Sequence, residues 1–152
     1  MLLASALGSA GFLWWVTALI AMVFPNKRSA AWRMILAVLV TWTIHEFALT
    51  PLIDRPRPFA VDATISVIDA KPTTSAFPSG HAAMAVAGAV AGSRMLPGAS
   101  VVWVPVAAIM AISQVYIGVH WPTDVIAGAV AGLAIAWFVL GGHSRSAIRL
   151  RR

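Results

Sequence analysis

Three clusters of polar residues in this sequence combine the residue types that bind or attack a phosphate group. Arginines supply positive charge, a serine-glycine pair at a helix start supplies backbone N–H groups, and histidine can act as nucleophile or acid. The clusters are distant in the sequence, so the fold must bring them together: Asp54-Arg55-Pro56-Arg57-Pro58-Phe59, Pro78-Ser79-Gly80-His81, and Ser113-Gln114 with His120-Trp121-Pro122-Thr123-Asp124.

The second cluster has the pattern of a helix start. Ser79 is a favoured N-cap, and Gly80 lets a substrate approach the backbone, so N–H groups of the first turn can hold a phosphate. His81 then lies beside that anion, within reach of a leaving oxygen. Serine-glycine caps without a function are common, but the histidine in the same turn and the arginine-rich loop favour a phosphate site.

His120 and Asp124 are four residues apart, which places them one turn from each other if a helix begins at about His120. A carboxylate bonded to one ring nitrogen fixes the tautomer and makes the other nitrogen more basic, as a nucleophilic histidine requires. The same residues fit an aspartate favoured by the helix dipole and an interfacial histidine beside Trp121. Both interpretations stay open from these residues alone.

Positive side chains near the clusters can neutralise a phosphate. Arg55 and Arg57 fit bidentate recognition of phosphate or, alternatively, anchoring at a membrane surface. No group of His, Asp and Glu has metal-ligand spacing, because the four histidines are far apart in the sequence, at positions 45, 81, 120 and 143. We therefore expect a site that works without a metal or another cofactor.

The elements that position these residues are expected to be membrane helices. Of the 152 residues, 60% are hydrophobic and 11% are charged, whereas about 25% of residues are charged in soluble proteins. Apolar segments suited to a hydrocarbon core of about 30 Å occur at residues 2–24, 30–49, 79–96, 100–119 and 122–140. We predict an all-α polytopic membrane helix bundle of about five transmembrane helices, forming one domain over residues 1–152. The first segment also fits a cleaved signal peptide, but no basic residues precede it.

A long loop is expected between the second and third helices, because residues 50–79 are polar and proline-rich. Within the later helices, Gly88 with Gly92 and Gly128 with Gly132 have the four-residue spacing that allows close helix contacts in lipid.

Basic residues are distributed unequally between the two ends of such a bundle. The end with the long loop carries three of them, Arg55, Arg57 and Lys71. The opposite end carries eight: Lys27, Arg28, Arg33, Arg94, Arg145, Arg149, Arg151 and Arg152. Positive residues favour the cytoplasm, so the loop should face outward and the C-terminus inward. The net charge of +6 then reflects topology and contact with anionic lipid, and we expect no nucleic-acid partner.

The three clusters together resemble the type 2 phosphatidic acid phosphatase superfamily, in particular its bacterial integral membrane branch. The resemblance covers residues 50–124 and includes Arg57-Pro58, all of Pro78-Ser79-Gly80-His81, and Ser113, His120 and Asp124 at the family's spacing. Thr50 replaces the signature lysine, and Gln114 replaces the signature arginine that follows Ser113. The usual family core also has six helices, one more than we expect here.

The resemblance implies a membrane phosphatase that removes phosphate from a lipid phosphate. It implies that His120 forms a phosphohistidine, that Asp124 orients it, and that His81 protonates the leaving oxygen and then activates water. The implied phosphate-binding residues are Arg57, Ser79, Gly80, Ser113 and Gln114, with Arg55 and Lys71 as substitutes for the missing cations. The lipid stays open between a polyprenyl phosphate, a phospholipid and a lipid-linked sugar phosphate.

Two other functions remain alternatives. A lipid-phosphate-binding subunit of a membrane complex, with a decayed site, is suggested by the two missing cations. A vanadate-dependent haloperoxidase uses a similar site, but those proteins are soluble.

We expect an integral protein of the bacterial inner or plasma membrane, with lipids as partners and a homo-oligomer as an open alternative. His45 and Glu46 have no role in the resemblance, although ionisable residues in a membrane helix usually face a partner or cavity.

The charge asymmetry predicts the outcome of a topology experiment. A reporter fused after Arg152 should be cytoplasmic, and one inserted near Thr64 should be external, because the basic residues favour the inner side. Two reporters on the same side of the membrane would contradict the arrangement of about five helices.

Overall fold

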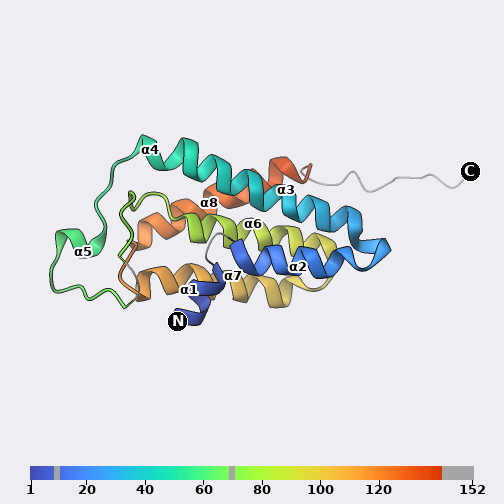
Figure 1. The fold of residues 1–152 in the computed structure, drawn as a ribbon, viewed down its shortest axis with the longest axis horizontal. Helices are drawn as coiled ribbons and strands as arrows, with labels where there is room; N and C mark the ends of the chain where they lie inside the picture. Colours follow the sequence, from blue (N-terminus) through green and yellow to red (C-terminus); the bar gives the residue numbers. More distant parts are fainter. Residues whose placement is uncertain (9–10, 69–70, 142–152) are drawn as a thin grey trace, which may run out of the picture.

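The structure, a computed structural model, is all-α and describes residues 1–8, 11–68 and 71–141. Its long helices run along a common axis, and the loop that carries α5 (Pro58–Val61) projects from one end of the bundle (Figure 1). The turn between α2 (Phe12–Met22) and α3 (Arg28–Ile44) lies at the other end (Figure 1). The basic segment at 145–152, predicted to anchor the C-terminus, lies outside the described residues.

The first predicted span is not one helix. It is divided into α1 (Leu2–Gly8) and α2 (Phe12–Met22), and Gly11, which precedes α2, has a left-handed φ of 75°. Only glycine adopts that conformation without strain, so the glycine marks where the helix cannot continue. With 11 residues, α2 is about 16 Å long, roughly half of a hydrocarbon core. α2 packs on α3 (Arg28–Ile44), and α1 packs on α7 (Ser100–Tyr116).

The second predicted helix is confirmed and is longer than expected. It begins with a short 3₁₀ turn, η2 (Pro25–Lys27), continues as α3 (Arg28–Ile44), passes through a π-helical turn (His45–Leu49), and ends in α4 (Thr50–Leu52). Together these form a helical run of 28 residues. π-Helical turns inside longer helices often lie at functional sites.

Three further helices form the centre of the bundle: α6 (Gly80–Met95), α7 (Ser100–Tyr116) and α8 (Pro122–Val139). α6 contacts α3, α7 and α8, and most of its alanines and glycines are buried. The four-residue glycine pairs lie at these contacts. Gly88 faces the ring of Trp14, and Gly128 and Gly132 face the backbone oxygens of Ser79 and Ala83. Small residues thus allow the helix backbones to approach closely, as in other membrane helix pairs.

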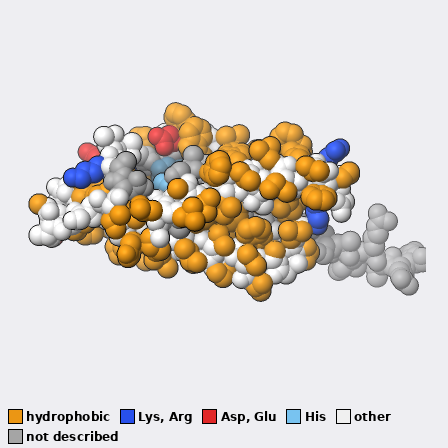
Figure 2. Space-filling model, turned by 60° about the horizontal axis from the view of Figure 1, so that its bottom comes forward, with side chains coloured by type: hydrophobic (Ala, Val, Ile, Leu, Met, Phe, Trp, Pro, Cys, Tyr) orange, Lys and Arg blue, Asp and Glu red, His pale blue; other side chains and the backbone are white. Residues whose placement is uncertain are grey.

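Apolar side chains cover the outside of the bundle. Figure 2 shows hydrophobic side chains across the middle of one face, with Lys and Arg toward its two ends. Two helical runs, Pro25–Leu52 and Pro122–Val139, are long and apolar enough to cross a membrane, and the apolar helices α2 and α7 are shorter. This distribution fits a lipid-exposed surface, because a soluble protein would expose such a surface to water.

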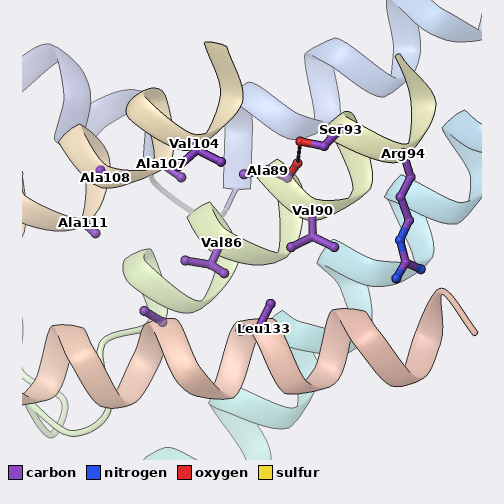
Figure 3. A pocket seen from close by; sticks show the side chains of 11 residues that line it. Val86, Ala89, Val90, Ser93, Arg94, Val104, Ala107, Ala108, Ala111 and Leu133 are labelled. Atoms are coloured by element: carbon purple, nitrogen blue, oxygen red, sulfur yellow. Dashed lines mark hydrogen bonds between the residues drawn. The ribbon is translucent and has the colours of Figure 1, made fainter. Parts of the chain in front are cut away.

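A groove between α6, α7 and α8 has a volume of about 550 Å³. Val86 and Val90 of α6, Val104 of α7 and Leu133 of α8 line it (Figure 3). Its one charged lining residue is Arg94, near the end of α6. The groove is therefore suited to apolar chains but carries none of the predicted catalytic side chains.

The close contact of α6 and α8 predicts that Gly132→Ala destabilises the protein. Alanine normally favours a helix over glycine by about 1 kcal/mol, but here the added Cβ would overlap the backbone oxygen of Ala83. We expect a loss of roughly 1–3 kcal/mol, seen as a lower midpoint of thermal unfolding in detergent. Ala134→Val adds bulk at an exposed position of the same helix and should leave the midpoint unchanged. An equal midpoint for Gly132→Ala and the unaltered protein would contradict this packing.

Candidate active site

The three polar clusters meet at the end of the bundle that carries the long loop, around a cavity of about 240 Å³. Predicted site residues that line this cavity are Arg57, Gly80, His81, Gln114 and His120. The cavity also has lining residues from α3, from the π-helical turn and from the loop, among them Trp42, His45, Glu46, Thr74 and Ser75.

Ser79 begins α6, as the sequence predicts. Its hydroxyl accepts a hydrogen bond from the N–H of Ala82 at 3.4 Å, and its own N–H donates to the Asp124 carbonyl oxygen at 2.9 Å. Ser79 is fully buried, so its side chain serves as a cap and its backbone joins the start of α6 to that of α8. Gly80 and His81 then extend the first turn along the cavity wall.

His120 is held in the turn between α7 and α8 with one ring nitrogen fixed. Its Nδ1 lies 2.8 Å from the carbonyl oxygen of Ala76, which can only accept, so Nδ1 carries the proton. The unprotonated Nε2 lies 3.4 Å from Nη1 of Arg57 at the cavity. Burial, together with the positive charge of Arg57, lowers the pKa of His120 to about 3. The ring is therefore neutral, with a lone pair on Nε2.

Asp124 lies close to His120 but is bonded to other groups. One carboxylate oxygen is 3.7 Å from His120 Nδ1, beyond hydrogen-bond distance, and accepts the N–H of Trp121 at 2.8 Å. The other oxygen accepts a hydrogen bond from Nη1 of Arg55 at 2.5 Å. Asp124 is fully buried, so Arg55 supplies the opposite charge that a buried carboxylate requires.

Arg57 connects the long loop to the turn that carries His120. Its guanidinium donates to the carbonyl oxygens of Thr74, Ser75 and Val119 at 2.9–3.1 Å, and to the Thr74 hydroxyl at 3.2 Å. Burial lowers the pKa of Arg57, and the charge of Asp124 raises it. Only 7% of the residue is exposed, so its charge acts on the cavity from within the protein.

The remaining predicted site residues do not point their polar groups into the cavity. Arg55 is bonded to Asp124 and Thr123, and Lys71 is exposed, with its ammonium 5.6 Å from the centre of the Phe59 ring. Ser113 is fully buried and donates to the Met110 carbonyl oxygen at 2.7 Å.

Gln114 is held by the first helix. Although it lines the cavity, its amide nitrogen donates to the hydroxyls of Ser5 and Ser113, each at 3.2 Å. Ser5 belongs to α1 and is buried. The contacts of Ser5 with Gln114 and of the Ala76 carbonyl with His120 could not be predicted from the sequence. A serine in an apolar segment and a backbone oxygen in a loop give no sequence signal.

Comparison with known families agrees with this geometry. The profile described as the PAP2 superfamily matches residues 30–147. The chain belongs to the PAP2 superfamily. The resemblance inferred from the three clusters is thus confirmed. Within the described residues, no three His, Asp or Glu side chains are grouped so that they could hold a metal ion.

Two curated PAP2-superfamily relatives are similar over most of this chain. It is 30% identical over 137 residues to an undecaprenyl-diphosphatase of Sulfolobus acidocaldarius, covering 88% of this chain and 65% of that protein. It is 32% identical over 140 residues to a decaprenylphosphoryl-5-phosphoribose phosphatase of Mycobacterium tuberculosis, covering 88% and 75%. The chain therefore spans about two thirds to three quarters of the length of these relatives.

Solved membrane structures have the same fold. The transmembrane PAP2 type phosphatidylglycerolphosphate phosphatase from Bacillus subtilis superposes with a TM-score of 0.71 at 24% identity, covering 97% of this chain and 76% of that one. LpxE of Aquifex aeolicus superposes with a TM-score of 0.77 at 25% identity, covering 90% and 81%. The chain is thus a membrane protein with the PAP2 fold.

The pairing of Arg55 with Asp124 predicts that Arg55→Ala destabilises the protein. Removing Arg55 leaves a buried carboxylate without its cation, and because Arg55 is itself 34% exposed the cost should be about 1–3 kcal/mol. Lys71→Ala is the matched control, since this exposed cation lies 5.6 Å from the centre of the Phe59 ring and should change stability by less than about 1 kcal/mol. Unfolding in detergent measures both.

A second change tests the cause. Asp124→Asn added to Arg55→Ala removes the unpaired charge, so the double variant should be more stable than Arg55→Ala alone. If Arg55→Ala and Lys71→Ala have equal effects, the ion pair does not stabilise the site.

Proposed function

We propose that this PAP2-superfamily protein is a phosphatase that removes phosphate from a lipid phosphate through a phosphohistidine on His120. The observation that carries the proposal is the state of His120. Its Nδ1–H is bonded to the Ala76 carbonyl, and its unprotonated Nε2 lies at a cavity next to Arg57. A neutral imidazole with a lone pair at the cavity is the species that attacks phosphorus.

The reaction would proceed in two steps. In the first, His120 Nε2 bonds to phosphorus, the bond from phosphorus to the lipid oxygen breaks, and that oxygen takes a proton from His81. In the second, His81 accepts a proton from water, the water oxygen bonds to phosphorus, and the bond to Nε2 breaks. Inorganic phosphate leaves and both histidines return to their first state.

The surrounding residues supply charge and position. Arg57 offers positive charge beside Nε2, and the first turn of α6 at Gly80 presents backbone to the phosphate oxygens. Asp124, at 3.7 Å from Nδ1, stabilises the positive charge that develops on the ring as it is phosphorylated. Ser79 acts as a cap, and Arg55 holds Asp124. Phosphoryl transfer depends mainly on such positioning and charge, so no metal is needed.

The substrate class we favour is a polyprenyl phosphate or diphosphate. Both curated relatives have names that refer to polyprenyl lipids. The cavity opens at the end of an apolar bundle, where the phosphate of a membrane lipid would be found. The unequal distribution of basic residues in the sequence supports an outward orientation of this end. About five transmembrane segments, with α1 and α2 together counted as the first, complete the proposed arrangement.

A phosphate-release assay tests this function. Purified protein in detergent should release phosphate from polyprenyl phosphates, with phosphatidic acid and a lipid-linked sugar phosphate as comparisons. His120→Ala should lower turnover at least about 1,000-fold, because the nucleophile is lost. Tyr116→Phe, at an exposed position near the end of α7, is the matched control and should retain activity.

The same assay separates the alternatives. Excess EDTA should leave turnover unchanged, and acid-labile phosphate should appear on the protein during turnover and be absent from His120→Ala. A chelator-sensitive activity restored by a divalent ion would exclude the metal-free mechanism. Binding of lipid phosphate without any release would favour the alternative of a decayed binding subunit, which the uncharged and internally bonded Gln114 makes a specific second candidate.

A further inference from the structure

His45 is a third histidine of the active-site cavity, and the proposed mechanism gives it no role. It lies in the π-helical turn and lines the same cavity as Arg57, His81 and His120. Its side chain is 14% exposed. The ring lies against Gly80, where any Cβ would come within 2.6 Å of the imidazole. His45 therefore forms the wall next to the turn that would hold a phosphate.

The two nitrogens of His45 have different surroundings. Nε2 is 3.0 Å from the carbonyl oxygen of Pro78, which only accepts, so Nε2 carries a proton in either charge state. The Thr50 hydroxyl is 3.4 Å from both nitrogens, and Nδ1 is 3.8 Å from a carboxylate oxygen of Glu46. Nδ1 is thus the nitrogen that can gain a proton while Nε2 keeps its bond to Pro78.

The cavity has little positive charge for a phosphate dianion. Apart from its histidines, its ionisable lining residues are Arg57 and Glu46, which carry charges of opposite sign when ionised. The N–H groups of Arg57 are already directed at oxygens of Thr74, Ser75 and Val119 and at His120 Nε2. The other two cations of the loop are directed elsewhere, Arg55 to Asp124 and Lys71 to the Phe59 ring. Any further positive charge at the cavity must come from a histidine, either His81, which is protonated when it donates to the leaving oxygen, or His45.

We propose that His45 adds a positive charge beyond those of Arg57 and His81, as a phosphate-binding residue that takes up a proton at Nδ1 when the phosphate dianion enters the cavity. The inference rests on the proposed function and extends it. In this role Nε2–H keeps its bond to Pro78, and the added charge lies against the backbone of Gly80, beside the place of the phosphate. The titratable and charged groups that face this part of the cavity are Glu46, Arg57, His81 and His120.

One consequence is a characteristic pH dependence. Histidine changes charge between about pH 5 and 8, so anion affinity should be high below that range and fall as pH rises through it. His120 does not share this change, because it stays neutral. Adding one charge at a few Å from the anion should change affinity by about 10- to 100-fold.

Binding of sulfate to the purified protein tests the proposal without requiring turnover. Sulfate is a phosphate-like dianion that does not titrate in this range, so any proton taken up belongs to the protein. Isothermal titration calorimetry at pH 6.0 and 8.5, in buffers of different ionisation enthalpy, gives both affinity and proton uptake. We expect the unaltered protein to bind sulfate at least about 10-fold more tightly at pH 6.0, with net proton uptake.

Two variants separate charge from structure. His45→Gln keeps an N–H donor for the Pro78 carbonyl but cannot become positive, so it should bind weakly at both pH values with less proton uptake. Thr50→Lys added to His45→Gln places a permanent ammonium next to the same position, and it should restore affinity at both pH values. Tyr116→Phe, at an exposed position that does not line the cavity, is the control and should bind as the unaltered protein does.

Several outcomes would overturn the inference. In the first, His45→Gln binds sulfate and takes up protons as the unaltered protein does. In the second, His45→Gln loses the same factor in affinity at both pH values. In the third, the unaltered protein binds no sulfate at pH 6.0. The equal loss would make His45 a structural clamp of the turn. Phosphate release is measured separately. Proton-linked sulfate binding without release would contradict the proposed function and leave the assignment of His45 standing.

Discussion

The backbone contact between α6 and α8 is the constraint on which the site depends. The N–H of Ser79 donates to the Asp124 carbonyl oxygen, and Gly128 lies directly over the Ser79 backbone. The start of the helix that would bind phosphate is therefore fixed against the start of the helix that carries Asp124. Without glycine at the contact the two helices would separate by the width of a side chain, and a misplacement of about 1 Å can cost about 100-fold in rate.

The loop is fixed to this centre by charge as well as by backbone. Arg57 bonds three carbonyl oxygens, two from the loop and one from the turn that precedes His120. Arg55 crosses from the other side of the same loop to Asp124. Burying a guanidinium and a carboxylate is costly unless each has full partners, and here the partners come from segments far apart in the sequence. The same bonds that satisfy these charges therefore hold the loop over the cavity.

The sequence contained the local features of this protein but not its long-range partners. The cap at Ser79, the starts and ends of the later helices and the meeting of the three clusters follow from residue types and apolar length, and the structure agrees with them. The break in the first span was missed, because an uncharged 23-residue segment satisfies the length criterion whether or not Gly11 interrupts it.

The hydrogen-bond partners of the site side chains were harder to predict from the sequence than the helices that carry them. The sequence placed Arg55 at a phosphate and Asp124 on His120, since opposite charges and four-residue spacing allow both. The structure instead joins Arg55 to Asp124 and gives His120 a backbone acceptor at Ala76. Which of several allowed partners a side chain takes depends on tertiary distances, and a backbone carbonyl has no side-chain signature in a sequence.

The backbone acceptor changes what the aspartate has to do. The Ala76 carbonyl alone fixes the Nδ1–H tautomer of His120. Its dipole also supports a proton on Nδ1, but it carries no net charge with which to stabilise a phosphorylated ring. Asp124, 3.7 Å from Nδ1 and fully buried, can supply that charge. In the resting state the carboxylate is paired with Arg55, while His120 is neutral. In the proposed mechanism, orientation of His120 and stabilisation of its phosphorylated ring are thus separate tasks, the first carried by a backbone oxygen and the second by the carboxylate of an ion pair.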